Sequence, residues 1–145
     1  MVKMIDISKK KNVERTATAT GEILLNRATI QKIKAKKVEK GDVLAAAQIA
    51  GIMAVKNTPD LIPLCHPIPI TSAKIDFVVK NGKIICTCTV NAFYKTGVEM
   101  EALSGVCAAL LSIWDMVKYL EKDEMGQYLD TAITNIRVVK KLKGE

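Results

Sequence analysis

The chain has 145 residues, of which 49% are hydrophobic and 26% are charged, a composition typical of a globular protein. No run of about 18 apolar residues is present, and the N-terminus lacks the apolar stretch of a signal peptide. These features argue against a membrane span and against export, so we expect a cytoplasmic protein. The length predicts a single domain over residues 1–145, in which the polar, lysine-rich residues 1–13 are loosely held.

The net charge of +7, from 22 basic and 15 acidic residues, favours an anionic partner. That partner is either a nucleic acid or a phosphorylated small molecule. Proteins that bind single strands usually stack bases on aromatic side chains, and only 4% of this chain is aromatic. The net charge does not distinguish the two kinds of partner, and few aromatic side chains are present for base stacking.

The first half of the chain predicts a strand followed by two helices. Residues 15–24 alternate small polar and apolar side chains, which is typical of a strand, and residues 26–37 carry isoleucines at helical spacing. After a Lys-Gly-Asp turn, Asp42 is a good N-cap for a helix over residues 43–55. This second helix is rich in alanine and glycine, so its slim surface would let another backbone approach closely.

The second half of the chain predicts three strands and one long helix. Residues 68–80 and 83–90 are predicted to be strands, and the Asn-Gly pair at 81–82 is a strong hairpin signal between them. Residues 97–122 predict a long helix with a broad apolar stripe at i, i+3 and i+4. Residues 132–140 predict the last strand.

The predicted order, β-α-α-β-β-α-β, fits an α+β fold, a ferredoxin-like sandwich that carries one extra helix. Its sheet would be antiparallel, with the helices on one face. The other face would then have to be covered, most simply by a second subunit.

Four cysteines are present, namely Cys65, Cys86, Cys88 and Cys107, and in a cytoplasmic protein they are expected to be reduced thiols. Cys86 and Cys88 would point to the same side of a strand, which permits a pair of metal ligands. Their spacing is not a common zinc spacing, however, and no second pair follows. We therefore expect both to pack as small hydrophobic residues, without a metal site.

The only histidine, His66, lies between Pro63 and Pro67, on a loop that the two prolines stiffen. Histidine is a common acid, base or ligand near neutral pH. A histidine on a loop can also bind a backbone carbonyl group without any chemical role. The residues alone leave both interpretations open.

Two carboxylates, Glu99 and Glu101, stand at the predicted start of the long helix. Thr96 and Glu99 have the spacing of a capping box, in which the glutamate would bind the Thr96 amide. Glu101 has no such explanation, although an acidic residue in a first turn is also favoured by the helix dipole. Lys95 precedes this helix start, and such a helix end readily binds anions.

Several further charged residues have a simple structural interpretation. Asp115 and Lys118 have the spacing of a surface ion pair on one helix, Lys40 lies on a turn, and Lys56 lies near a helix end. Glu101 and Asp115 are separated by roughly 21 Å if the helix is continuous, at 1.5 Å per residue. Side chains that far apart either contact different ends of a long ligand or belong to sites completed across an interface.

Five short segments are distinctive when taken together. Residues 60–67 read Asp-Leu-Ile-Pro-Leu-Cys-His-Pro, and residues 95–103 read Lys-Thr-Gly-Val-Glu-Met-Glu-Ala-Leu. The others are Lys-Gly-Asp-Val at 40–43, Ile-Ala-Gly-Ile at 49–52 and Asp-Met-Val-Lys at 115–118. In this order they resemble the cyclic pyranopterin monophosphate synthase family, the C proteins of molybdenum cofactor biosynthesis.

The resemblance implies a ferredoxin-like subunit in a hexamer, built as a trimer of dimers with active sites at the dimer interfaces. It implies a lyase that converts 3′,8-cyclo-7,8-dihydroguanosine 5′-triphosphate to cyclic pyranopterin monophosphate and pyrophosphate. No tightly bound cofactor is expected, and Mg²⁺ is expected only as an ion carried by the triphosphate. Neither a nucleic acid nor a membrane is expected as a partner.

The resemblance also assigns site residues by position. It implies catalytic lysines at Lys40 and Lys118 and an active-site aspartate at Asp115. Arg15 and Lys56 fall on basic positions that contact the phosphates. The positions that contact the rest of the substrate fall on Leu64, Cys65, His66, Glu99, Met100 and Glu101.

One departure from the family pattern concerns the C-terminus. Many family members end in a Gly-Gly-Lys-Ser-Gly tail, whereas this chain ends in Val-Val-Lys-Lys-Leu-Lys-Gly-Glu. A tail lysine that contacts the triphosphate would therefore have to be replaced by Lys140, Lys141 or Lys143.

Two other classes of function compete with an enzyme. A basic nucleic-acid-binding module is the main alternative, but sheets that bind RNA usually carry aromatic residues on their central strands. The candidate strands here hold only Phe77, Phe93 and Tyr94. A purely structural assembly subunit is the other alternative, and it would leave the Lys, His, Glu and Asp residues above unexplained.

Overall fold

The computed structural model describes residues 1–145. Its helices and strands are, in chain order, β1 Val13–Leu24, α1 Arg27–Lys34, α2 Val43–Lys56, α3 Thr58–Leu61, β2 Ile70–Lys80, β3 Lys83–Tyr94, α4 Glu99–Glu121 and β4 Ala132–Lys143.

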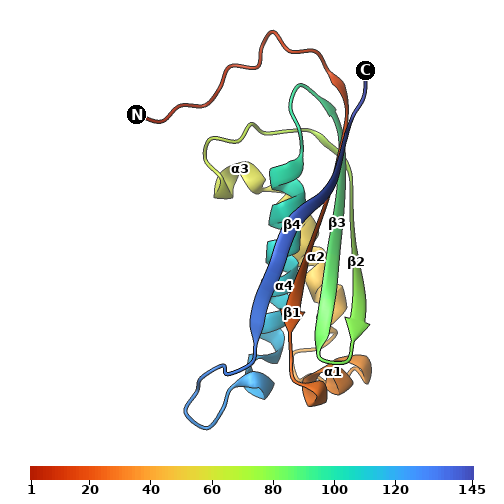
Figure 1. Ribbon diagram of the computed structural model, residues 1–145, viewed down its shortest axis with the longest axis vertical. Coiled ribbons are helices and arrows are strands. Elements are labelled where there is room, and N and C mark those ends of the chain that lie inside the picture. The colour runs from red at the N-terminus through yellow and green to blue at the C-terminus, as the bar shows by residue number, and fades with distance from the viewer.

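The four strands form one open antiparallel sheet in the order β2-β3-β1-β4. The helices α2 and α4 lie side by side against one face of this sheet, and α1 lies at the end where β1 finishes (Figure 1). The predicted α+β class, with an antiparallel sheet and helices on one face, is therefore confirmed.

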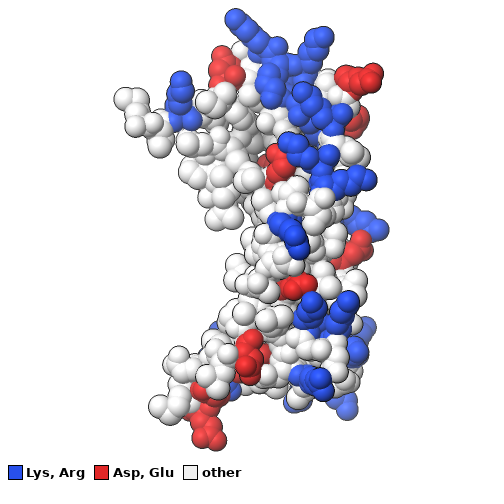
Figure 2. Space-filling view, in the orientation of Figure 1, with Lys and Arg blue, Asp and Glu red and all other residues white.

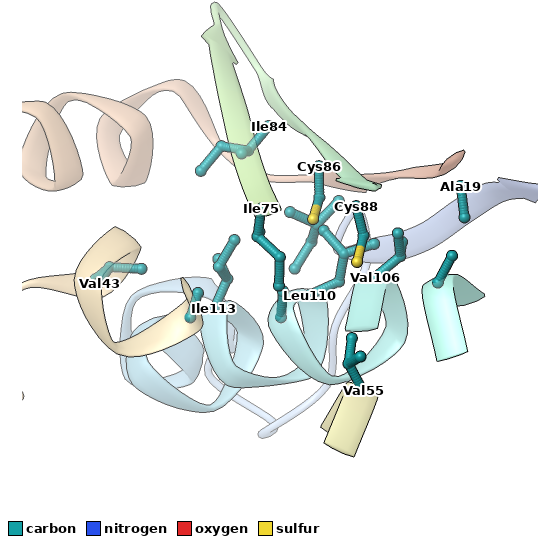
Figure 3. Packing of buried hydrophobic residues seen from close by; sticks show 14 of the residues in the cluster. Ala19, Val43, Val55, Ile75, Ile84, Cys86, Cys88, Val106, Leu110 and Ile113 are labelled. Atoms are coloured by element: carbon teal, nitrogen blue, oxygen red, sulfur yellow. The ribbon is translucent and has the colours of Figure 1, made fainter. Parts of the chain in front are cut away.

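The core fills the space between the sheet and these two helices. Every second residue of β3 from Ile84 to Ala92 is buried, and α4 contributes Val106 and Leu110 to the same cluster. Figure 3 shows Cys86 and Cys88 pointing into this cluster. Their burial raises the pKa of both thiols to about 12. The predicted packing of this pair as small hydrophobic residues is confirmed.

The two long helices cross at a pair of glycines, Gly51 of α2 and Gly105 of α4. A Cβ atom added to Gly51 would lie 2.9 Å from the Gly105 carbonyl oxygen and 2.1 Å from Ile75 Cδ1. A Cβ atom added to Gly105 would lie 2.7 Å from Cys88 Sγ. The slim surface predicted for the second helix does therefore admit another backbone.

The helix α4 has 23 residues and is long and apolar enough to cross a membrane by length and composition alone. Of its most apolar window, 56% is buried inside the protein. It packs against α2, β1 and β3 as the central helix of the core. Its hydropathy is thus explained by the fold itself.

Several element boundaries differ from the predictions, and one helix was not expected. The strand β3 continues to Tyr94 rather than ending at residue 90, because its last residues pair with the start of β1, with Tyr94 opposite Val13. The helix α1 ends at Lys34, and Lys36 adopts a positive φ of 55° that stops it. The one-turn helix α3, which contains a proline in its first turn, was not expected.

The centre of the sheet face away from the helices is polar. Thr16 Oγ1 donates a hydrogen bond to Asn91 Oδ1 at 2.6 Å, and the hydroxyl oxygens of Thr18 and Thr89 are 3.1 Å apart. These half-buried side chains form cross-strand pairs between β1 and β3. A subunit that covers this face would thus meet threonine and asparagine side chains at its centre, together with the exposed side chains of Val78, Phe93 and Leu142.

Candidate active site

The predicted site residues gather at two opposite ends of α4. At the N-terminal end a cavity of about 370 Å³ opens between the start of α4, the loop after α3 and the first residues of the chain. We call this cavity the first pocket. Its lining residues are Lys3, Ile5, Ile7, Lys10, Leu64, Cys65, His66, Ile68, Thr96, Gly97, Glu99, Met100 and Glu101.

All six residues that were expected to contact the body of the substrate line the first pocket. Three of them lie on the loop that follows α3, and three lie in the first turn of α4. The loop stands over the helix start because α2 runs alongside α4 and ends at the same end of the molecule (Figure 1). The six residues are Leu64, Cys65, His66, Glu99, Met100 and Glu101.

The His66 ring is bonded to the backbone of the N-terminal segment. Its Nε2 atom lies 2.7 Å from the carbonyl oxygen of Ile5. Because a carbonyl oxygen can only accept, Nε2 carries the hydrogen and donates it. The structure thus realises the carbonyl-binding alternative for His66, and it does so at the wall of a cavity, where the ring is also available to a ligand.

Glu101 is the buried acid of the first pocket, with only 2% of its surface exposed. Burial raises the pKa of its carboxyl group, and the neighbouring Glu99 adds to this effect. Burial also raises the pKa of the Cys65 thiol, with a smaller contribution from Glu101. A carboxyl group with a raised pKa can hold or release a proton closer to neutral pH than an exposed one.

The predicted capping box is wrong. The N-cap of α4 is Val98, and no side chain caps this helix end. Glu99 is therefore the first helical residue rather than the third, and its carboxylate makes no capping hydrogen bond. Instead Glu99 Oε1 lies 3.7 Å from Nζ of Lys141 on β4. One of the C-terminal lysines thus reaches the rim of the first pocket.

Near the C-terminal end of α4, Asp115 and Lys118 of this helix and Lys40 of the turn before α2 form a Lys–Asp–Lys cluster. Lys40 Nζ lies 2.9 Å from Asp115 Oδ2 and 3.2 Å from the Asp115 carbonyl oxygen. Lys118 Nζ lies 3.4 Å from Asp115 Oδ1, so the predicted pair on the helix is present. The hydrogen bonds from Lys40 and Lys118 lower the pKa of the Asp115 carboxyl group. All three side chains are exposed.

The turn that carries Lys40 is held in place by the helix. The amide of Glu39 donates a hydrogen bond to Tyr119 Oη at 2.9 Å. Gly41 then reverses the chain with a φ of 114°, and Asp42 caps α2 by accepting from the Ala45 amide at 3.1 Å, as predicted. These contacts aim Lys40 at Asp115, which lies 75 positions later in the sequence.

The structure does not bring the two groups of residues together within one chain. Glu101 and Asp115 lie on one unbroken helix, and their separation is roughly 21 Å along its axis. The carboxylates of the first pocket and the Lys–Asp–Lys cluster thus cannot contact the same reacting atom from a single subunit.

Arg15 and Lys56 lie outside the first pocket. Arg15 Nη2 donates to the Lys95 carbonyl oxygen at 3.3 Å, while its buried Nε atom has no hydrogen-bond partner. Arg15 lines an adjoining cavity, which we call the second pocket, together with Lys10, Lys11, Val13, Lys143, Gly144 and Glu145. Lys56 lines a groove together with Ile52 and Ile68, and Ile68 also lines the first pocket.

The end of the molecule that holds the second pocket is strongly basic. Figure 2 shows Lys and Arg side chains gathered at this end, where the chain terminus and the start of β1 lie in Figure 1. Lys143 pairs with Arg15 across β4 and β1, so both side chains point to the same side of the sheet. This concentration of positive charge can bind an anion such as a polyphosphate.

Sequence reasoning missed the contribution of the N-terminal segment to the first pocket. Lys3, Ile5, Ile7 and Lys10 all line it. The segment has no regular secondary structure and no periodic pattern that could have indicated a fixed position.

Within residues 1–145, no group of three or more His, Cys, Asp or Glu side chains lies close enough together to hold a metal ion. The chemical groups that the site offers are carboxylates, ammonium groups, a thiol and an imidazole. They can transfer protons and stabilise negative charge, which are the two tasks of acid–base and electrostatic catalysis.

Comparison with known proteins identifies relatives over nearly the whole chain. Residues 4–144 match the MoaC family. A probable cyclic pyranopterin monophosphate synthase from Thermococcus kodakarensis is 61% identical over 99% of this chain and 92% of its own length. A protein of the same name from Archaeoglobus fulgidus is 60% identical, also over 99% of this chain and 92% of its own length. A probable cyclic pyranopterin monophosphate synthase accessory protein from Methanothermobacter thermautotrophicus is 57% identical over 99% of this chain and 91% of its own length. On this similarity, and in agreement with the motifs in its sequence, the chain belongs to the MoaC family.

Proposed function

We propose that the protein is a cyclic pyranopterin monophosphate synthase that acts in molybdenum cofactor biosynthesis. It is a lyase that converts 3′,8-cyclo-7,8-dihydroguanosine 5′-triphosphate to cyclic pyranopterin monophosphate and pyrophosphate. Family membership and the names of relatives about 60% identical support this assignment.

The observation that carries the proposal is the Lys–Asp–Lys cluster. Lys40, on a turn 75 positions before Asp115, and Lys118, on the same helix as Asp115, place their ammonium groups around the Asp115 carboxylate. The two N–O distances are 2.9 and 3.4 Å. Two adjacent ammonium groups suit a reaction in which charge develops on phosphate oxygens. In the last step a ribose-derived hydroxyl attacks the α-phosphorus, a new P–O bond forms, and the bond to pyrophosphate breaks.

Lys40 and Lys118 are proposed to stabilise the developing phosphate charge, and one of them to exchange the hydroxyl proton. Asp115 is proposed to orient the two ammonium groups. Its lowered pKa favours this orienting role, because the carboxylate stays ionised and binds a proton weakly at neutral pH.

The first pocket is proposed to hold the ring system of the substrate. Glu101, a buried acid with a raised pKa, suits proton transfer while the purine-derived ring is opened and rebuilt. His66 on its stiff loop orients this end of the substrate, with Leu64, Cys65 and Met100 around it. Arg15 and Lys56 are proposed to contact the phosphates, and Lys141 or Lys143 to replace the missing tail lysine.

The proposed assembly is a hexamer, a trimer of dimers in which each site is shared between two chains. The separation of the two groups of site residues along α4 supports a shared site, because one chain cannot supply both to one reacting group. The exposure of the Lys–Asp–Lys cluster, in which Asp115 is 59% exposed, leaves it free to face a neighbour. A two-fold axis would then complete two equivalent sites at once.

We further propose that the enzyme is a single domain that works in the cytoplasm without a tightly bound cofactor. Its catalytic groups are side chains, and Mg²⁺ enters only as an ion carried by the triphosphate.

The test is an assay of the purified protein with the cyclised guanosine triphosphate, in which pterin product and pyrophosphate are measured together by mass spectrometry and a coupled phosphate assay. We expect the two products in equal amounts. GTP itself should give neither product, and the Asp115→Asn variant should give little of either. Failure of the folded wild-type protein to form the pterin would refute the proposal.

A further inference from the structure

The turn between α1 and α2, which carries Lys40, has few anchors of its own. Between Lys34 and Val43, only Val38 is buried. The Gly41 amide donates to the Val38 carbonyl oxygen at 3.0 Å, so residues 38–41 form a β-turn with Glu39 and Lys40 at its centre. This bond gives the turn its shape, but it does not set the position of the turn against α4.

One hydrogen bond joins the backbone of this turn to α4. The Glu39 amide donates to Tyr119 Oη at 2.9 Å. It is the only hydrogen bond between the backbone of residues 38–41 and this helix. Tyr119 is therefore the acceptor that fixes a turn lying 80 positions earlier in the sequence.

Tyr119 belongs to the same face of α4 as the Lys–Asp–Lys cluster. It lies four positions after Asp115 and directly after Lys118, and side chains four apart on a helix are neighbours. Two consecutive residues of the turn are thus bonded to this face. Glu39 is bonded through its amide, and Lys40 is bonded through Nζ, which lies 2.9 Å from Asp115 Oδ2.

The Lys40 side chain depends on this support because a lysine has a long, flexible stem. The position of its ammonium group follows from the place at which its backbone is held. The side chain is 45% exposed, so packing against its stem is limited. The bond from the neighbouring Glu39 amide to Tyr119 holds that backbone within reach of Asp115.

We propose that Tyr119 is a positioning residue, which places Lys40 in the Lys–Asp–Lys cluster by holding the backbone of the turn. Tyr119 acts through Lys40 and not on the reacting atoms. Its effect on the reaction rests on the proposed function, whereas its effect on the position of Lys40 does not.

A matched pair of variants, Tyr119→Phe and Tyr128→Phe, tests the proposal. Each removes one phenolic oxygen and keeps the ring. Tyr128 packs edge-on against Trp114 through its ring, with the centroids 5.1 Å apart, so its substitution preserves that contact. Tyr119 is 43% exposed, so the loss of its hydroxyl should leave the fold intact.

The pKa of the Asp115 carboxyl group reports on the contact with Lys40, because the hydrogen bond from Lys40 is the largest cause that lowers it. It can be followed by NMR of ¹³C-labelled aspartate and assigned by its loss in Asp115→Asn. Tyr119→Phe should raise this pKa toward its ordinary value, by less than Lys40→Ala does, while Tyr128→Phe leaves it unchanged. An unchanged pKa in Tyr119→Phe, or an equal rise in both tyrosine variants, would overturn the proposal.

Turnover gives a second measurement. Tyr119→Phe should lower kcat about fivefold, the scale of one neutral hydrogen bond. In a Lys40→Ala background the same substitution should change neither kcat nor the pKa of Asp115, because the residue that it positions is already gone. A further fivefold loss in that background would show that Tyr119 acts by another route, and the proposal would be wrong.

The two proposals fail in different ways. If the wild-type protein makes no pterin but Tyr119→Phe raises the pKa of Asp115 as predicted, the proposed function is wrong and the positioning of Lys40 stands. If the pterin is formed and Tyr119→Phe leaves both kcat and this pKa unchanged, the function stands and the role of Tyr119 is refuted.

Discussion

At the scale of single residues, the chemistry rests on how each charged group is held. Asp115 is fixed by two ammonium groups, which keep it ionised, whereas Glu101 is buried beside another acid, which favours its protonated form. Two carboxyl groups on one helix are therefore driven in opposite directions by their surroundings. Opposed environments of this kind are typical of groups with separate chemical roles.

The Lys–Asp–Lys cluster gives the first prediction. Lys118→Ala should lower kcat by at least about 10²-fold, the scale of losing one acid–base or electrostatic group. Lys122→Ala is the matched control, since Lys122 is exposed near the end of the same helix and outside the cluster. Steady-state assays of both folded variants provide the measurement. Turnover of Lys118→Ala that matches the control would count against a chemical role for Lys118.

Glu101 gives a prediction about stability and pH. Its pKa is raised in the folded chain, so the stability that it contributes is complete at low pH and is lost as pH rises through the raised value. Glu101→Gln should therefore increase Tm at pH 7 by roughly 2–4 °C for each kcal/mol of relieved burial cost. The gain should disappear below about pH 4, where the acid is protonated in both states.

The control for this change is Glu124→Gln at an exposed position, which should leave Tm unchanged across the same pH range. Glu101→Gln should lose activity while it gains stability, a trade-off common at functional sites. A lower Tm for Glu101→Gln at pH 7 would contradict the proposed cost of burying the ionised acid.

At the scale of elements, α2 and α4 set the positions of both groups of site residues. Their close crossing at Gly51 and Gly105 fixes the axis along which the first pocket and the Lys–Asp–Lys cluster are separated. Glu121 closes the far end of α4: its carboxylate accepts hydrogen bonds from the Asn26 amide and from the hydroxyls of Thr29 and Thr131. The helix is thereby held at both its crossing point and its C-terminal end.

The close crossing of the two helices predicts that a Gly→Ala substitution there lowers the stability of the protein instead of raising it. Gly→Ala inside a helix normally stabilises by about 1 kcal/mol. At Gly51 the new methyl group would lie 2.9 Å from a backbone oxygen of α4, so the helices would have to move apart. We expect Gly51→Ala to destabilise the protein by about 1–3 kcal/mol, the typical cost of overpacking. Urea unfolding provides the measurement, and a stabilised variant would show that the helices are not in tight contact.

The regular elements could be predicted because each depends on a local pattern. The alternation in β1, the Asn-Gly turn and the stripe of α4 are examples, and such patterns predicted the class of the fold and the order of every element except α3. The last residues of β3 were missed because asparagine is uncommon in strands, whereas the alternation in fact continues through Asn91, and pairing with Thr16 of β1 keeps the strand in place. Contacts between distant segments cannot be inferred from spacing, as the Lys40–Asp115 pair and the contact of His66 with the Ile5 carbonyl oxygen illustrate.

At the scale of the whole molecule, the distribution of charge indicates the kind of ligand that the protein attracts. Basic residues gather at the end that holds the second pocket, and Figure 2 shows further Lys and Arg side chains toward the opposite end. The exposed Lys–Asp–Lys cluster lies outside the second pocket. A basic end suits a triphosphate, and its attraction for that ligand should weaken as salt is added.

The proposed hexamer predicts a mass in solution. Light scattering should give about 95 kDa, six times the 15.9 kDa of one chain, as closed dihedral symmetry requires. A monomer at assay concentration that is fully active would rule out a site shared between subunits.

The central claim is that each active site combines the first pocket of one chain with the Lys–Asp–Lys cluster of another. It is tested most directly by co-expressing two inactive variants, His66→Ala and Asp115→Asn, with different affinity tags, and by purifying the mixed oligomers through both tags. In a mixed dimer one of the two sites at the shared interface contains both intact groups, and the other contains both substitutions. Random mixing should therefore restore about a quarter of the wild-type activity when the two-fold symmetric sites are independent. Activity in verified mixed oligomers that does not exceed that of the single variants would contradict the claim.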